Sequence, residues 1–169
     1  MDRSDPSASP RLRLEPLSSD HLDVLFALLD DPGLHTFIGG EPRSREELAG
    51  WIDAVTAGGS RDGGECWLNW VVRRRDDDEV VGTVQATIVE DEASIAWVIG
   101  TAFQGRGYAK EGAGSMAEWL RSHANVTRLR AAIHPDHPAS QAVARSLGLE
   151  PTDEIDDGEV VWRTPATDP

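Results

Sequence analysis

Three strand-like segments follow one another in the middle of the chain with only short turns between them. Trp67–Arg73, Val80–Val89 and Ala93–Ile99 are rich in β-branched and aromatic residues. The turns between them, Asp76–Glu79 and Glu90–Glu92, are short and acidic. Turns this short join antiparallel neighbours, because parallel strands need a long crossover. The centre of the fold is therefore predicted to be two antiparallel hairpins that share a strand.

Helices and further strands are predicted on both sides of these hairpins. Apolar residues recur at helical spacing after Ser19 or Asp20, a candidate N-cap, and again after the capping box of Ser44 and Glu47. The remaining predicted elements are a strand at Arg11–Leu17, a helix at about Tyr108–His123, a strand at Leu129–Ile133, a helix at Ala139–Leu147 and a strand at Val160–Arg163. Residues 150–158 are predicted to be a polar connector. This order is typical of a mixed α+β fold.

The length and the two ends of the chain indicate one domain. With 169 residues, roughly two-thirds of the unfolded surface can be buried. Residues 1–10 and 164–169 are rich in Ser, Pro, Ala and Asp and are predicted to be disordered tails. Residues 11–163 are predicted to form the single folded domain between them.

The chain is strongly acidic, with 30 Asp and Glu against 16 Lys and Arg and a formal net charge of -14. Phosphate groups would be repelled, which predicts no nucleic-acid partner and no anionic membrane. Lys110 is the only lysine. A GC-rich genome that replaces Lys by Arg, or adaptation to salt, would explain the charge. A surface suited to cationic amine substrates is the alternative.

No targeting or membrane segment is visible in the sequence. The N-terminal residues lack the apolar region of a secretory signal, and no run approaches about 18 apolar residues. Cys66 is the only cysteine, which excludes an intramolecular disulfide. These features predict a cytoplasmic protein.

A glycine-containing loop leads from a predicted strand into the long helix, with glycines at Gly105 and Gly107. Glycines let backbone N–H groups approach an anion, and a helix N-terminus adds unpaired donors and the positive end of the helix dipole. Arg106 and Lys110 add positive charge. No Asp or Glu lies between Ala93 and Lys110. The loop is therefore predicted to bind an anion such as a pyrophosphate.

The common nucleotide-binding motifs do not fit this loop. The dinucleotide motif G-x-G-x-x-G has Lys110 in place of its third glycine. The P-loop requires Ser or Thr directly after its lysine, where Glu111 stands here. A plain glycine turn between strand and helix is the remaining alternative to a phosphate site.

Gln104-x-x-Gly107-x-Ala109 resembles the acyl-coenzyme-A loop of the GNAT N-acetyltransferases, Q/R-x-x-G-x-G/A. A second stretch, Ala131 to Leu149, resembles that family's N-x-x-S-x-x-[VA]-x-x-x-x-G-F motif. The resemblance covers residues 11–163. The N-terminal strand and the Asp31-Pro32 helix end are similar to the branch that acetylates the N-termini of ribosomal proteins.

The resemblance implies an α+β fold with a mixed, mostly antiparallel sheet of about six or seven strands, splayed at its centre and flanked by about four helices. It implies acetyl-CoA as co-substrate, lying between the strands Ala93–Ile99 and Leu129–Ile133. Backbone groups of Val98 and Ile99 would pair with the pantetheine arm and polarise the thioester carbonyl. The coenzyme-binding residues that it implies are Val98, Ile99, Gln104, Gly105, Arg106, Gly107, Tyr108, Ala109, Lys110, His137 and Ser140.

Two departures from the family pattern concern the second motif. His137 stands where the family has Asn, and it can hydrogen-bond the coenzyme or cap the helix with a proton that titrates. The closing aromatic is replaced by Leu149. His134 and His137 also have H-x-x-H spacing, but they lie on a loop without an evident third ligand, so no metal is expected.

The catalytic groups are less clearly marked. Many family members use a tyrosine after the second motif as the acid for the departing thiolate, and residues 149–169 contain none. Ser140 is the positional match; the alternative is a first-turn residue that satisfies helix donors. Glu92 and Glu65 are candidate bases that act through water, or else solvated turn residues. Trp51 is expected in the wall of the acceptor pocket.

The leading hypothesis is an acetyl-CoA-dependent N-acetyltransferase in which a primary amine, of a small molecule or of a peptide or protein N-terminus, attacks the thioester directly. The alternative is a non-catalytic acyl-CoA-binding module, which the missing tyrosine favours. An enzyme that modifies charged tRNA is a third hypothesis, disfavoured by the acidic surface. The resemblance leaves open whether the protein is a homodimer.

Overall fold

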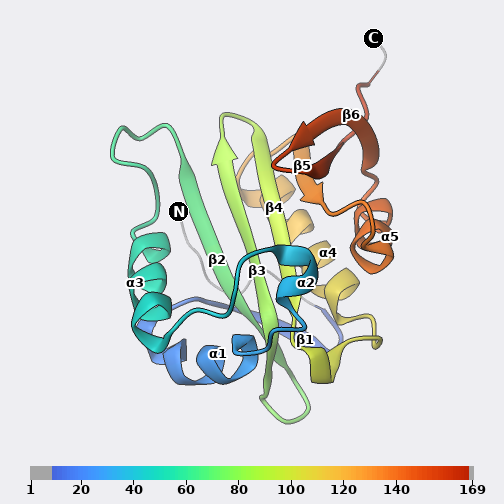
Figure 1. The fold of residues 1–169 in the computed structure, drawn as a ribbon. Helices are drawn as coiled ribbons and strands as arrows, with labels where there is room; N and C mark the ends of the chain where they lie inside the picture. The colour runs from blue at the N-terminus through green and yellow to red at the C-terminus, as the bar shows by residue number, and fades with distance from the viewer. Residues whose placement is uncertain (1–8, 168–169) are drawn as a thin grey trace.

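A seven-stranded sheet in the order β1-β2-β3-β4-β5-β7-β6 runs through the computed structural model, which describes residues 9–167 apart from the side chain of Ile38 (Figure 1). The strands are β1 (Leu12–Pro16), β2 (Cys66–Arg74), β3 (Val80–Val89), β4 (Glu92–Ile99), β5 (Arg128–Ile133), β6 (Glu150–Asp156) and β7 (Glu159–Arg163). All neighbouring strands are antiparallel except β4 and β5, which are parallel. The predicted α+β class and the mixed sheet are confirmed.

The two predicted hairpins form as expected. Trp70 lies opposite Val84, and Val84 in turn lies opposite Trp97, so the three strands share one register. Each turn places one acidic residue in the left-handed region, Asp78 at φ 64° and Glu90 at φ 56°. Asp is one of the residue types that tolerate this conformation in turns.

Strands β4 and β5 separate after a short pairing, as the family resemblance implies. Their parallel pairing extends only from Glu92 opposite Arg128 to Ser94 opposite Arg130. Beyond that point β5 pairs with β7 on its other side. Among the described residues, no strand pairs with residues 95–99 of β4 on the side facing β5. The sheet therefore opens at its centre, and we call this opening the splay.

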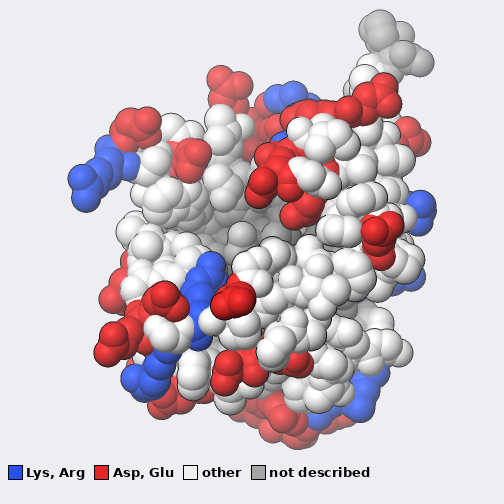
Figure 2. Space-filling view, viewed as in Figure 1, with Lys and Arg blue, Asp and Glu red and all other residues white. Residues whose placement is uncertain are grey.

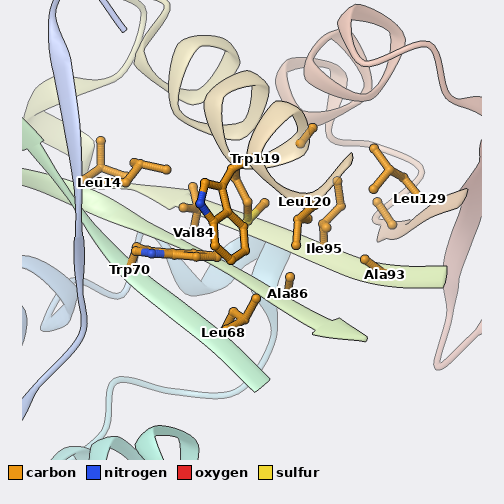
Figure 3. Close-up of a cluster of buried hydrophobic side chains, with 14 of the residues drawn as sticks. Leu14, Leu68, Trp70, Val84, Ala86, Ala93, Ile95, Trp119, Leu120 and Leu129 are labelled. Atoms are coloured by element: carbon orange, nitrogen blue, oxygen red, sulfur yellow. The ribbon is translucent and has the colours of Figure 1, made fainter. Parts of the chain in front are cut away.

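Helices cover both faces of the sheet. They are η1 (Ser19–His21), α1 (Leu22–Leu29), α2 (His35–Ile38), α3 (Arg45–Thr56), η2 (Thr101–Phe103), α4 (Tyr108–His123) and α5 (Pro138–Ser146). Helix α4 packs on one face, where Trp119 meets Trp70 edge to face with ring centroids 5.6 Å apart (Figure 3). On the other face, α1 packs on β3 and α3 on β2, with Leu25 and Ile52 buried between them, and α2 lies in front of β4 (Figure 1).

Two elements were missed by the periodicity analysis. Residues 150–156, predicted to be part of a connector, form the strand β6, which pairs with β7 at the edge of the sheet. Both faces of β6 are largely exposed, so it has no apolar alternation to mark it. Helix α2 has only four residues, too few to show a helical period. The first helical segment begins after Ser18 rather than after Ser19 or Asp20.

The predicted tails lie partly outside the described residues, which exclude 1–8 and 168–169. Two residues placed in those tails belong to the folded domain. The Ser9 side chain is buried and donates a hydrogen bond to Glu111 in α4. Thr164 extends the pairing at β5, because its N–H donates to the Leu129 carbonyl at 3.0 Å. Both boundaries of the predicted domain therefore move outward by at least one residue.

Candidate active site

The splay contains a cavity of about 460 Å³, which lies in the size range of ligand-binding pockets. Its wall is built by β4, by the glycine loop, by the first turns of α4 and α5 and by residues 33–37. Of the predicted coenzyme-binding residues, all but Arg106 line it, namely Val98, Ile99, Gln104, Gly105, Gly107, Tyr108, Ala109, Lys110, His137 and Ser140. The side chains of Trp97 and Phe37, which were not predicted, also line it.

The direction of the β4 backbone corrects one detail of the sequence interpretation. The N–H of Gly100 donates to the Val81 carbonyl of β3 at 2.9 Å. Backbone groups of alternate residues point to the same side of a strand, so Val98 also faces β3. Trp97 and Ile99 instead direct their N–H and C=O groups into the splay. The pairing with an extended ligand that was expected of Val98 and Ile99 can thus be made by Trp97 and by the N–H of Ile99, whose carbonyl already accepts a hydrogen bond from Gln104 Nε2 at 3.0 Å.

The glycine loop adopts a backbone suited to an anion. Gly105 and Gly107 have φ of 76° and 81°, values that residues with a Cβ rarely adopt. Gly107 is the N-cap of α4, and no side chain caps this helix end. By contrast, Ser44 and Glu47 form the predicted capping box at α3. The first N–H groups of α4 are therefore available to a ligand in the cavity.

The two cations of the loop have different positions. Lys110 is exposed and lines the cavity. Arg106 does not line it; its carbonyl accepts a hydrogen bond from Arg11 Nη1 at 2.9 Å. The Arg74 guanidinium lies 3.4 Å from the Tyr108 hydroxyl and, with a smaller contribution from Arg106, lowers the pKa of that phenol. The expected contact between Arg106 and a coenzyme stays a prediction: Arg106 does not line the cavity, but its side chain interacts with Tyr108, which does.

Ser140 reaches across the splay from the first turn of α5. Its Oγ accepts a hydrogen bond from Trp97 Nε1 of β4 at 3.3 Å. In this contact Ser140 accepts from a side chain of β4 and not from a backbone N–H of its own helix, which was the alternative role. His137 is the N-cap of the same helix by position, but its side chain makes no capping hydrogen bond.

A short segment crosses the front of the splay. This strap, residues 31–40, contains α2, and Gly33, Leu34 and Phe37 of the strap line the cavity. The Phe37 ring stacks on the His137 ring, with centroids 4.3 Å apart and planes 6° from parallel. At its start, Asp31 accepts a hydrogen bond from Thr101 Oγ1 at 2.6 Å. The strap is thus attached both to α5 and to the turn that precedes the glycine loop.

The strap contact predicts that coenzyme affinity falls at acidic pH. Phe37 and His137 both line the larger cavity, so weakening their stack would loosen its wall. Burial, with a smaller effect of His134, lowers the pKa of His137 below its usual value of 6.5. The stacked state thus favours neutral His137. The stabilisation of the stack is complete above pH 6.5, the usual pKa of histidine, and is lost as the pH falls through the lowered pKa of His137. Calorimetry with coenzyme A between about pH 8 and pH 5 should show this loss.

Substitution identifies the group responsible for this pH dependence. His137→Asn should make the affinity flatter with pH than in the wild type, because the titrating ring is gone. His123→Asn, which removes a histidine stacked on Trp119 away from the cavity, should keep the wild-type pH dependence. Equal profiles in all three proteins would contradict a role for His137.

A second cavity of about 180 Å³ lies on the α1 and α3 face of the sheet. Trp51 of α3 lines it, as the sequence predicted for the acceptor wall. Val98 lines both this cavity and the larger one. The two cavities therefore meet at one residue of β4, which is the arrangement that a reaction between two separately bound substrates requires.

Polar residues that the sequence analysis missed also line the smaller cavity. Asp30 is exposed, and Arg43 lies over the Trp51 ring at 5.2 Å from its centroid. His35 is held between two backbone carbonyls, with Nδ1 3.1 Å from the Gly39 oxygen and Nε2 3.4 Å from the Leu29 oxygen. Asp30, His35 and Arg43 stand at helix ends or in a loop, where no periodic pattern singles them out.

The two candidate bases lie elsewhere. Glu92 is at the opposite end of β4 from Val98, about 20 Å away at the rise of an extended strand. There it forms ion pairs with Arg163 at 2.5 Å and with Arg128 at 3.8 Å. Glu65 accepts a hydrogen bond from Trp67 Nε1 at 2.8 Å and lines neither cavity. This position does not support Glu92 as catalytic base, because its carboxylate pairs with arginines of β5 and β7.

A metal site and a membrane-spanning helix are both absent from residues 9–167. No group of three or more His, Cys, Asp and Glu side chains is arranged to hold a metal ion. His134 and His137 both contact the ring of Phe37. None of the helices is both long and apolar enough to pass through a bilayer.

The larger cavity fits acetyl-CoA. Its open β4 edge offers backbone groups to an extended amide-containing arm, and the uncapped end of α4 offers N–H groups to a pyrophosphate. Lys110 adds a cation at that end of the cavity. When bound, acetyl-CoA supplies an acetyl group activated as a thioester.

Comparisons with known proteins agree with this geometry. The model of the acetyltransferase (GNAT) domain family matches residues 11–150. A search of curated proteins found no match.

Solved structures with the same fold include RimL, a ribosomal-protein alpha-N-acetyltransferase in complex with coenzyme A. It has 17% identity and a TM-score of 0.79 over 95% of this chain and 97% of that one. An acetyltransferase from Agrobacterium tumefaciens has 24% identity and a TM-score of 0.73 over 93% and 92%. One from Salmonella typhimurium that modifies the N-terminal serine of a 50S ribosomal subunit protein has 16% identity and a TM-score of 0.76 over 95% and 98%.

At these identities the solved structures establish the fold, and the family match over most of the chain establishes the relationship. The chain belongs to the GNAT acetyltransferase family, and its reaction transfers the acetyl group of acetyl-CoA to an amine.

Proposed function

We propose that the acceptor is the α-amino group at the N-terminus of a polypeptide, which enters through the 180 Å³ cavity and reaches the thioester at Val98. The observation that carries this proposal is the shared position of Val98 between the two cavities. The alternative acceptor is a small primary amine, which the same cavity would admit.

The sheet surface beside the smaller cavity favours a chain-like acceptor. Asn69, Gln85 and Ala96 lie opposite one another on β2, β3 and β4, and Gln85 and Ala96 are exposed. This row includes Gln85, which lines the cavity together with Thr83. Figure 2 shows a hollow at the centre of this face with acidic side chains, and also a basic one, on its rim. A hollow of this kind has room for residues beyond the reacting amine, and its rim attracts an ammonium group.

The fold neighbours give independent support. The Salmonella typhimurium protein modifies an N-terminal serine, and RimL is an alpha-N-acetyltransferase of a ribosomal protein. The N-terminal strand of this chain also resembles that branch. These relationships favour the α-amino group of a polypeptide as the class of acceptor.

In the proposed reaction, the neutral amine attacks the thioester carbonyl, the carbon–nitrogen bond forms and the carbon–sulfur bond breaks. The N–H groups of Trp97 and Ile99 face the splay and are placed to stabilise the developing oxyanion. Asp30 in the smaller cavity is placed to hold the incoming ammonium near water, which takes up its proton.

Ser140, which lies beside Trp97 in the wall of the larger cavity, is the proposed partner of the leaving thiolate. A hydroxyl is a much weaker acid than a thiol, whose pKa is about 8.5. Ser140 therefore stabilises the leaving thiolate as a hydrogen-bond donor and need not transfer its proton completely. This refines the role of acid that the sequence analysis gave it.

A panel of matched amines tests the acceptor class. Release of the coenzyme thiol would be followed with acetyl-CoA and a hexapeptide that begins with serine, the same peptide with its N-terminus blocked and one internal lysine, and serine amide. The proposal predicts turnover that is greatest with the free N-terminus. Turnover of serine amide alone would assign a small-molecule acceptor, and turnover of the lysine peptide alone would assign side-chain amines.

Asp30→Asn is expected to raise the KM for the amine about 1.4- to 5-fold while leaving the KM for acetyl-CoA unchanged, because an exposed ion pair contributes about 0.2–1 kcal/mol. Steady-state kinetics on the best acceptor would measure both constants. Asp23→Asn is the matched control: Asp23 is also exposed, pairs with Arg45 and does not line the cavity. An equal effect of both substitutions would show that overall charge, and not Asp30, is responsible.

A further inference from the structure

We propose that Trp97 is a positioning residue for acetyl transfer: its indole N–H fixes the orientation of the Ser140 hydroxyl, so that the hydroxyl proton is directed into the coenzyme cavity. The inference rests on the proposed role of Ser140 beside the leaving thiolate. It adds a side chain on β4, the Trp97 indole, that acts through Ser140.

The two side chains differ in their hydrogen-bonding capacity. An indole Nε1–H can only donate, whereas a serine hydroxyl both donates one proton and accepts. In the Trp97–Ser140 contact at 3.3 Å, the serine oxygen must therefore be the acceptor. Trp97 occupies one acceptor position of the Ser140 oxygen, so the Ser140 hydroxyl proton must point away from the indole.

The surroundings of Ser140 decide where that proton points. Within residues 9–167, no acceptor for the Ser140 hydroxyl proton lies within hydrogen-bonding distance. Ser140 and Trp97 both line the 460 Å³ cavity, and both residues are half-buried. The cavity is thus the direction left for the proton, and an acceptor there would complete the pair.

The position of Trp97 on β4 matches this role. Trp97 lies next to Val98, the residue at which the coenzyme and acceptor cavities meet. Its ring packs against the buried core on the α4 side, which holds the indole N–H in place. When the amine attacks and the carbon–sulfur bond breaks, the sulfur leaves as a thiolate that accepts the Ser140 hydrogen bond. The proton of the amine nitrogen passes to water.

Donation from Trp97 would act in two ways. It restricts the hydroxyl to fewer of its three staggered orientations, and it polarises the O–H bond toward the thiolate. Together these effects are expected to change the rate by roughly 5-fold. The loss of the whole serine hydroxyl should cost more than the loss of its orientation.

Bound coenzyme A gives a test that needs no acceptor. The thiol pKa of coenzyme A would be measured from its thiolate absorbance in complex with wild type, Trp97→Phe and Ser140→Ala, with the titration of Cys66 subtracted from unliganded protein. The wild type is expected to have the lowest thiol pKa, Trp97→Phe about half a unit higher and Ser140→Ala about one unit higher. Equal values in wild type and Trp97→Phe would overturn the proposal.

A double-mutant cycle on kcat separates positioning from a structural effect. Trp97→Phe should lower kcat roughly 5-fold in the wild-type background and leave it unchanged in Ser140→Ala. An equal loss in both backgrounds would mean a structural role for Trp97 and would overturn the proposal. Trp67→Phe is the matched control, since it removes the indole hydrogen bond to Glu65 outside both cavities and should not alter kcat.

The outcomes also distinguish this proposal from the proposed function. If Ser140→Ala does not change the thiol pKa or kcat, the role of Ser140 fails and the role of Trp97 fails with it. If Ser140→Ala has the expected effects and Trp97→Phe has none, only the role of Trp97 fails. Thermal unfolding and the Kd of coenzyme A for each variant would verify that the fold and the cavity are retained.

Discussion

Ser140→Ala is expected to lower kcat for acetyl transfer about 10- to 100-fold, because a hydrogen bond to a charged group contributes about 1.5–3 kcal/mol. The bond is made to the thiolate and hardly at all to the uncharged thioester. It therefore stabilises the transition state more than the bound substrate. The KM for acetyl-CoA should change by less than about 2-fold, which steady-state kinetics with the best acceptor would show.

The matched control for this loss is Ser146→Ala in the same helix. Ser146 Oγ donates to the Val143 carbonyl at 2.6 Å and lines neither cavity. Its removal should leave kcat unchanged. A Ser140→Ala enzyme with wild-type kcat would mean that the thiolate leaves without help from this hydroxyl, as free or solvent-stabilised thiolate.

Gly82→Ala is expected to damage both the stability and the coenzyme site. A Cβ on Gly82 would overlap the Val98 carbonyl oxygen and approach the Ile99 Cα to 3.1 Å. Both are backbone atoms of β4, so β3 and β4 must separate exactly where the two cavities meet. Overpacking of this kind costs about 1–3 kcal/mol. For a chain of this size, the Tm should fall by roughly 2–12 °C.

The same substitution should weaken coenzyme A binding, because the shifted strand carries Trp97 and Ile99. A loss of about 1.4 kcal/mol of binding free energy would weaken the affinity roughly 10-fold. Differential scanning calorimetry and titration calorimetry would give the two values. Gly114→Ala is the matched control: nothing lies within 4 Å of its added Cβ, and Ala is the better helix former. Gly114→Ala should raise the Tm slightly and leave affinity unchanged; an unchanged Tm for Gly82→Ala would contradict the close approach of β3 and β4.

Much of the fold could be predicted because its elements carry strong local patterns. The β2–β3–β4 hairpins, the capping box at Ser44 and the helix Tyr108–His123 all lie where periodicity and turn chemistry indicate. The edge strand β6 carries no such pattern, because neither of its faces is buried. Its existence depends on pairing with β7, an interaction that alternation within residues 150–156 does not reveal.

The candidate site likewise has parts that the sequence predicts and parts that it does not. The glycine loop could be located because positive φ at Gly105 and Gly107 is a local requirement that the sequence displays. The contacts of Phe37 with His137 and of Trp97 with Ser140 join segments far apart in the chain, and no local pattern marks them.

Glu92 shows the limit of reasoning from position along a strand. Its place beside the coenzyme strand suggested a base, whereas the parallel pairing with β5 sets it at the closed end of the splay, between Arg128 and Arg163. Which end of β4 opens is decided by the register with β5. That register depends on contacts between distant segments and not on the residues around Glu92.

A crystal structure with coenzyme A would test these assignments together. We expect the pantetheine arm along residues 95–99 of β4, hydrogen-bonded to the backbone of Trp97 and Ile99, with the thiol sulfur within hydrogen-bonding distance of Ser140 Oγ and next to Val98. The pyrophosphate should contact the N–H groups between Gly105 and Ala109. A sulfur remote from Ser140, or an arm bound outside the splay, would contradict them.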